Sequence, residues 1–451
     1  MELDMTKGKP SSLIIKFIIP IIIGNVFQQF YSMVDTIIVG RFVGVQALAA
    51  VGATGTISFL ILGFMMGLTT GFTVLTSQRF GAGDEEGVKK SVTNAILLSV
   101  VTTVIMTGVS MWGMDGLLRL MNTPEDIFEM SKTYIMIICG GMICSNFYNL
   151  LASILRAVGN SKVPLLFLIV SAVLNIVLDL LLVLVIPMGV AGAAWATVIS
   201  QGVSAVLCLI YIIKKVPIFS FKKEYWHWDM HCVRNQVSIG IPMALQFSIT
   251  AIGTIMVQTA LNMLGSTVVA AYTAANKVEQ LVTQPFVAMG MTMATYGAQN
   301  RGVNDLDRIR KGVRTANVMN VIYAVVIYGV VYTILPYMIR LFVSGDISEV
   351  LDYARTYIII AGAFFIPLGM IFIFRNIMQG CGFGFIPMLG GVVELLSRLV
   401  GAFVAARMLS YEGVCFANIS AWCSAAIFLA ISYIFVMRKM IKDKAAYESA
   451  S

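Results

Sequence analysis

The chain has 451 residues, of which 58% are hydrophobic and 12% are charged, and its mean hydropathy is +0.87. Soluble domains carry roughly 45–50% apolar and 25% charged residues, so this composition excludes an ordinary soluble protein and predicts a polytopic membrane protein. The net charge of +8 would suit a nucleic-acid partner, but the positions of the basic residues argue against one.

The first apolar segment begins after Lys7-Gly8-Lys9-Pro10 and continues to Gly40. A signal peptide would have a shorter apolar core followed by a small-residue cleavage site. No such site follows here, so we expect a retained first transmembrane helix.

Twelve segments are apolar and long enough to cross roughly 30 Å of hydrocarbon, which takes about 20 residues of helix. They are 12–39, 46–79, 88–112, 127–155, 162–186, 189–213, 235–263, 267–300, 309–338, 350–378, 384–407 and 413–437. Each must be helical, because an open sheet would leave backbone groups unpaired in lipid. We therefore predict an all-α membrane protein with an N-lobe at 1–213, a cytoplasmic linker at 214–234 and a C-lobe at 235–451.

The two halves repeat each other. Shifted by 221 positions, the Q-x-x-G-x-x-D motif of residues 78–84 falls on residues 299–305, and after a slip of two residues Tyr134 matches Tyr357. With six spans in each half, both halves start on the same side and are parallel repeats. This duplication predicts two pseudo-symmetric six-helix lobes of a transporter that face one substrate path.

The basic residues predict the topology. Most of the 31 Lys and Arg lie in tails, loops, linker and span ends that face the cytoplasm when the N-terminus is placed there. By the positive-inside rule, both termini are cytoplasmic and the chain is a multi-pass protein of the cell (plasma or inner) membrane. Basic loops beside anionic headgroups explain the net charge without a nucleic-acid partner.

Ionisable residues within spans are costly and usually functional. Asp35 lies about one turn inside the external end of the first span, and Asp179 about two turns inside that of the fifth. Asn175 is one turn deeper than Asp179 on the same face, and Thr197 of the sixth span has a similar depth. Such oxygens suit Na⁺, or two coupled carboxylates that hold a proton. The alternative is that each group only caps or joins helices.

These segments resemble the MATE (multidrug and toxic compound extrusion) transporters, over essentially the whole chain and most closely in the prokaryotic branch with DinF-type members. The resemblance rests on M-V-D-T at 33–36, A-L-A-A-V-G at 47–52, N-I-V-L-D at 175–179, G-A-A-W-A-T at 192–197 and A-A-N-K-V-E-Q at 274–280. It implies that Asp35, Asn175, Asp179 and Thr197 couple transport to a cation. It also implies that two lobes form a V that opens alternately to either side.

Relatives of NorM place a coupling carboxylate in the seventh span, where this chain has Gln246 and no acid. Glu279 of the eighth span is the nearest replacement. It either binds substrate or ion, or balances the charge of Lys277 nearby.

The eleventh span holds Glu394 and Arg398, four residues apart, and we expect them to form an intrahelical pair. Arg375, near the cytoplasmic end of the tenth span, is expected to snorkel to the interface.

Amide and aromatic side chains within the spans, together with 28 Met, predict an adaptable apolar cavity with a few polar anchors, although most Met are equally explained as lipid-facing residues. The candidate substrate-binding residues are Gln28, Tyr31, Gln246, Glu279 and Gln284.

We therefore predict a secondary active multidrug efflux transporter that exports lipophilic or cationic small molecules by antiport with H⁺ or Na⁺. The alternative is a lipid-linked oligosaccharide flippase of the same superfamily, whose cavity should be basic. The chain has no G-x-x-x-x-G-K-[ST] motif, so we expect no enzymatic activity and no cofactor beyond the coupling ion. The expected partners are drugs or toxic organic cations and membrane lipids, with the chain acting as a monomer.

Overall fold

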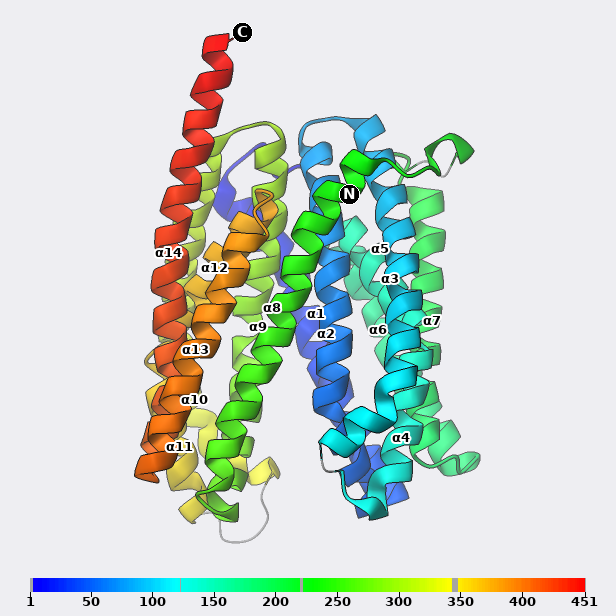
Figure 1. Ribbon diagram of the computed structural model, residues 1–451, viewed down its shortest axis with the longest axis vertical. Helices are drawn as coiled ribbons and strands as arrows, with labels where there is room; N and C mark the ends of the chain where they lie inside the picture. The colour runs from blue at the N-terminus through cyan, green and yellow to red at the C-terminus, as the bar shows by residue number, and fades with distance from the viewer. Residues whose placement is uncertain (1–2, 122, 220–221, 343–347, 451) are drawn as a thin grey trace. The chain divides into compact units, whose positions relative to one another are not determined.

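The computed structural model describes residues 3–121, 123–219, 222–342 and 348–450, and every regular element in these ranges is a helix (Figure 1). The first half contains α1 (Pro10–Ile38), η1 (Val39–Val43), α2 (Val45–Gly81), α3 (Glu85–Leu120), α4 (Glu125–Gly140), α5 (Met142–Ala157), α6 (Lys162–Asp179), η2 (Leu180–Val185) and α7 (Val190–Lys215). The second contains η3 (Lys223–Tyr225), α8 (Met230–Asn262), α9 (Ser266–Gly302), α10 (Leu306–Phe342), α11 (Ser348–Gly362), α12 (Phe365–Gly380), α13 (Phe385–Met408) and α14 (Tyr411–Ala450). The predicted all-α fold class is confirmed.

Within the described ranges, nine helices are long and apolar enough to cross a membrane, or up to eleven if each bent pair is one span. The bent pairs are α4 with α5, at 46°, and α11 with α12, at 50°, and they coincide with the fourth and tenth predicted spans. The predicted span 267–300 is α9, a helix of 37 residues. This helix is not one of the nine, because its acid, lysine and amide side chains lower its mean hydropathy.

The chain packs into two compact units. One consists of Ile19–Phe247 with the described residues before Met5, and the other of Met5–Ile18 and Ser248–Ser451. The helices α1 and α8 therefore each contribute residues to both units. The lobes predicted at 1–213 and 235–451 stay a prediction, and two linker residues, 220–221, lie outside the described residues.

The repeat appears in the corners between helices. Gly83 has a φ of +72° and Asn304 a φ of +54°, and they stand at equivalent places between α2 and α3 and between α9 and α10. Only glycine and, less readily, asparagine adopt this left-handed conformation easily. The next residue caps the following helix in both corners: the Oδ1 atoms of Asp84 and Asp305 each accept a backbone N–H three residues on, at 2.9 Å. One corner geometry thus occurs twice.

Within the first unit, α2 packs directly on the first half of α8 through small residues. A Cβ atom on Gly71 would lie 2.4 Å from the Cα of Gly240, and one on Gly67 would lie 2.6 Å from the Cα of Ala244. Gly67 and Gly71 are four residues apart on α2, and Gly240 and Ala244 are four residues apart on α8. This small-xxx-small pattern lets membrane helices approach backbone to backbone.

The linker is held on the start of α3. The Thr93 Oγ1 donates to the Tyr225 carbonyl at 2.9 Å, and the Asp229 N–H donates to Asn94 Oδ1 at 3.0 Å. The Asp229 carboxylate then caps α8. The backbone N–H of Cys232, which donates to it at 3.2 Å, holds the pKa of Asp229 below its usual range.

Candidate functional site

Two carboxyl groups, one buried and one partly buried, meet in the first unit. Asp35 lies in the last turn of α1 and Asp179 is the last residue of α6, so they come from helices far apart in the chain. Their carboxyl groups are within hydrogen-bonding reach of each other. Asp179 is fully buried and Asp35 is partly buried. Acidic residues expected at one depth are therefore direct neighbours.

The other two predicted coupling residues lie in the same unit. Asn175 is one turn before Asp179 on α6 and is 1% exposed. Its Nδ2 donates to the Thr197 Oγ1 of α7 at 3.5 Å, and that hydroxyl donates to the Ala193 carbonyl at 3.1 Å. The structure thus brings two carboxyls, an amide and a hydroxyl together across α1, α6 and α7.

Several oxygens of this cluster have no N–H or hydroxyl donor in the described structure. They are Asp35 Oδ1, Asn175 Oδ1, and both Asp179 oxygens. Buried oxygens in this condition are expensive unless a proton or cation satisfies them. The described residues form no group of three or more His, Cys, Asp and Glu that could hold a metal. A Na⁺ ion would therefore depend on the neutral oxygens of Asn175 and Thr197 as well as on the carboxylates, a ligand set that fits a hard monovalent cation.

Both acid-bearing helices change geometry just after the acid. The chain continues from α1 into the π-helical segment η1, and from α6 into η2, which starts at the residue after Asp179. Short π-helical segments are rare and often occur at functional sites. Around them lies a small apolar core that includes Val39, Val183 and Ala193. The two acids therefore lie beside buried apolar side chains and a locally irregular part of the unit.

Two tyrosines beside this cluster have no part in the predicted coupling set. Tyr31, a predicted substrate residue, bonds Gln28 and Gln201 and lies within electrostatic reach of Asp35. Tyr134 of α4 is 9% exposed and lies within electrostatic reach of both Asp35 and Asp179. One feature of the sequence could have pointed to Tyr134, because the internal repeat pairs it with Tyr357.

The predicted substrate residues divide between the units. Gln28 is exposed on α1, while Gln246 is partly buried on the α8 stretch that packs with the first unit. Gln284 of α9 is partly buried, and its Nε2 donates to the Gln280 carbonyl of its own helix at 2.9 Å. Glu279, also on α9, is 9% exposed and accepts a hydrogen bond from the Tyr357 hydroxyl.

The alternative partner of Glu279 is not observed. Lys277 is exposed, and the described contact of the Glu279 carboxyl is with Tyr357 of α11. Since these residues are 78 positions apart, only the fold could bring them together.

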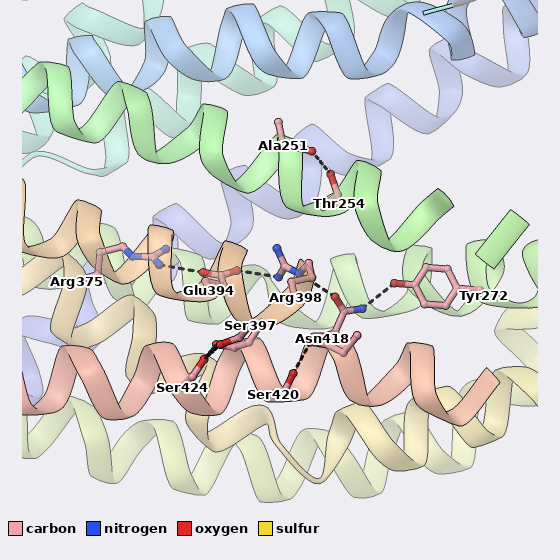
Figure 2. A network of polar contacts seen from close by, with 12 residues as sticks. Ala251, Thr254, Tyr272, Arg375, Glu394, Ser397, Arg398, Asn418, Ser420 and Ser424 are labelled. Atoms are coloured by element: carbon pink, nitrogen blue, oxygen red, sulfur yellow. Dashed lines mark hydrogen bonds and ion pairs between the residues drawn. The ribbon is translucent and has the colours of Figure 1, made fainter. Parts of the chain in front are cut away.

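A buried polar network crosses the second unit (Figure 2). The Arg398 Nη2 donates to Glu394 Oε1 at 2.8 Å, which confirms the predicted intrahelical pair. The Arg375 Nη2 donates to the other oxygen of Glu394 at 3.1 Å. Arg375 is 5% exposed, so the expectation that it snorkels to the interface is wrong. Its helix, α12, faces α13, and the nearby carboxylate stabilises its charge inside the protein.

The network continues toward α9. The Arg398 Nε donates to Asn418 Oδ1 at 3.1 Å, and the Asn418 Nδ2 donates to the Tyr272 hydroxyl at 2.9 Å. The Tyr272 ring packs edge-on against Tyr357, with centroids 4.8 Å apart. Figure 2 shows this run of side chains from Arg375 to Tyr272.

Comparisons with known proteins agree with this architecture. The MatE family model matches residues 20–181 and again residues 239–404, one match in each half of the chain. The chain is 28% identical over 381 residues to "Probable multidrug resistance protein YpnP" of Bacillus subtilis, covering 84% of both chains. It is 32% identical over 351 residues to "Probable multidrug resistance protein YoeA" of the same organism, covering 75% of both.

Solved structures show the same fold. A crystal structure of MATE in complex with MaL6 superimposes with a TM-score of 0.91 at 21% sequence identity, and the match covers 97% of this chain and 99% of that one.

Proposed function

The chain belongs to the MatE family of multidrug efflux transporters, and on this premise we propose that it exports lipophilic or cationic small molecules by antiport with H⁺ or Na⁺. The observation that carries the proposal is the Asp35–Asp179 pair, two carboxyl groups facing each other in a buried part of the first unit. Intramembrane acids in such positions are costly and are retained where they carry ions or protons.

The chemistry of coupling follows from the charge of the pair. Two adjacent carboxylates repel each other strongly where water is scarce, so one proton or one cation stabilises them. Binding or release of that ion changes the charge of the cluster by one unit. Because η2 starts at the residue after Asp179 and η1 begins one turn after Asp35, repacking there is the response we propose to link ion binding to drug release.

The ligand set is compatible with either ion. A proton requires only the two carboxyls, whereas Na⁺ would also use Asn175 Oδ1 and the Thr197 hydroxyl oxygen. The free Asn175 Oδ1 supports the second possibility. Without Asn175 the proton mechanism would survive and the Na⁺ mechanism would not.

The proposed substrate-binding residues are Gln28, Tyr31 and Gln246 in the first unit and Glu279 and Gln284 in the second. Among these, Glu279 is the acid, and its burial strengthens its electrostatic attraction for a cationic ligand. We also propose that the protein acts as a monomer in the cell membrane, with both termini and the linker in the cytoplasm.

The flippase alternative would need buried bases free to hold a pyrophosphate. The buried arginines of the described residues, Arg375 and Arg398, both pair with Glu394. Asp179, which is buried, and Asp35, which is partly buried, would repel such an anion when they are ionised. The geometry therefore favours drug export.

Everted membrane vesicles test the proposal, because export then appears as accumulation of a cationic dye inside. A proton gradient and a Na⁺ gradient, each imposed alone with the ion concentrated inside, should differ in their effect, and the effective one identifies the coupling ion. Asn175→Leu should abolish Na⁺-driven accumulation and leave proton-driven accumulation largely intact. Dye accumulation that responds to neither gradient would refute antiport.

A further inference from the structure

The second unit buries four charged side chains among its described residues, and they form one connected system. They are Glu279, Arg375, Glu394 and Arg398, each less than a tenth exposed. Glu394 sits between the two arginines, so these three carry a surplus of one positive charge. Glu279 supplies the balancing negative charge when it is ionised. Net charge inside a low-dielectric protein is costly, so this arrangement favours an ionised Glu279.

The contact between the two ends is continuous. Arg398 bonds Asn418, Asn418 bonds Tyr272, and the Tyr272 ring packs on Tyr357, whose hydroxyl bonds Glu279. Each of these side chains is less than a tenth exposed. A displacement of the Arg398 guanidinium would therefore pass through packed side chains to the carboxyl group.

The Arg398 guanidinium lies against the backbone of α8 at Gly253. A Cβ atom on Gly253 would lie 2.6 Å from Arg398 Nη1, closer than real Cβ atoms approach a neighbour. The Nη1 atom has no acceptor in the described structure. Glycine at 253 thus leaves space that the Arg398 guanidinium fills, and a larger residue there would displace it.

We propose that Arg398 is a positioning residue: acting through Asn418, Tyr272 and Tyr357, it keeps the Glu279 carboxyl ionised and oriented, and so sets how strongly the transporter prefers a cationic ligand over a neutral one. The ligand preference rests on the proposed export function. The effect on the Glu279 charge does not.

Other titratable groups act on Glu279 from the helices packed around α9, or lie close to it. They are Tyr357 of α11, Arg398 of α13, Cys415 of α14, Tyr323 of α10, which bonds the Val282 carbonyl, Arg375 of α12, and Tyr272 and Lys277 of α9 itself. The tyrosines and the cysteine are neutral near pH 7, Lys277 is exposed, and Arg375 lies beyond Glu394 in the network. Arg398 is therefore the charge with the most direct influence.

Infrared spectroscopy of the full-length protein in lipid nanodiscs can read the Glu279 carboxyl directly, as the protonated-carboxyl band that Glu279→Gln removes. We expect Arg398→Gln to raise the pH at which half of this band is present by on the order of one pH unit, since a nearby positive charge favours the ionised carboxylate. Arg398→Lys should restore most of the shift, because it keeps the charge.

Arg375→Gln is the matched control. It removes the same charge from the same Glu394, but at the far end of the network, so we expect a clearly smaller shift than for Arg398→Gln. Gly253→Ala provides a second test that changes no charge and displaces the guanidinium, and it should shift the band in the same direction by less. It also decides the matter if Arg398→Gln does not fold. Equal shifts for the two arginine variants would overturn the proposal, as would unshifted bands in Arg398→Gln or, where that variant does not fold, in Gly253→Ala.

Dye binding on the same samples tests the ligand preference separately from the effect of Arg398 on the Glu279 charge. For a matched pair of cationic and neutral dyes, Arg398→Gln should weaken binding of the cation about threefold at a pH midway between the two band midpoints, because the ionised fraction of Glu279 falls from about three quarters to about one quarter there, and it should leave binding of the neutral dye unchanged. A wild-type protein that binds neither dye would refute the proposed function, while the infrared shifts would still decide the role of Arg398.

Discussion

Replacing Gly71 by alanine should loosen the packing of α2 on α8 in the first unit. The added Cβ would lie 2.4 Å from the Cα of Gly240 and 2.7 Å from its nitrogen, whereas ordinary contact begins at 3.4 Å. These neighbours are backbone atoms, so no side-chain rotation relieves the overlap. The two helix backbones would have to separate by about 1 Å, the difference between the ordinary and the imposed distance.

The size of the effect follows from two opposed terms. Overpacking of this kind costs about 1–3 kcal/mol, while alanine gains roughly 0.5–1 kcal/mol over glycine in a helix. Subtracting the midpoints of these two ranges leaves a net loss of stability of about 1 kcal/mol. Gly55, on the same helix, has no atom within 4 Å of its Cβ position, so Gly55→Ala should show only the gain.

Thermal unfolding of the purified proteins in one detergent, followed by intrinsic fluorescence, compares the two variants with the wild type. We expect the transition of Gly71→Ala to move to lower temperature, and that of Gly55→Ala to stay or rise. If Gly71→Ala unfolds at the same temperature as Gly55→Ala, the backbone contact between α2 and α8 does not exist as described.

Four further outcomes are expected. Asp35→Asn and Asp179→Asn should each abolish drug resistance at wild-type protein levels, because the remaining carboxylate no longer has the charged neighbour whose repulsion an ion relieves; full resistance in either variant would refute their role. Glu279→Gln should weaken binding of a cationic dye more than that of its neutral analogue, and equal losses would assign Glu279 to folding or coupling. A cysteine at the exposed Lys222 should resist an impermeant thiol reagent added to intact cells, after correction for the native cysteines, and labelling there would contradict a cytoplasmic linker. Asp229→Ala should lower the free energy of unfolding by about 1 kcal/mol through the lost helix cap, whereas Asp229→Asn should retain most of the cap. Because the folded pKa of Asp229 lies below its usual range, the stability difference between wild type and Asp229→Ala should be complete near neutral pH and disappear as the pH falls through that lowered pKa.

Features of this protein that depend on a single helix could be predicted from the sequence. Hydropathy alone located the spans, because the thickness of the hydrocarbon layer sets their length. The Glu394–Arg398 pair was predictable since residues four apart share one helix face. Depth within a span, counted in turns, also placed Asp35, Asn175, Asp179 and Thr197 at one level.

Contacts between helices needed the tertiary structure. Depth does not say which way a side chain points or which helix stands beside it, so Arg375 was expected at the interface when α13 in fact offers it Glu394. The same reason hid the bond between Tyr357 and Glu279, although the repeat already paired Tyr357 with a tyrosine of the first half. The sequence by itself determined the all-α membrane class and the candidate acids, because these depend on local composition. The neighbours that give each buried charge its partner depend on lateral packing, and only the folded chain decided them.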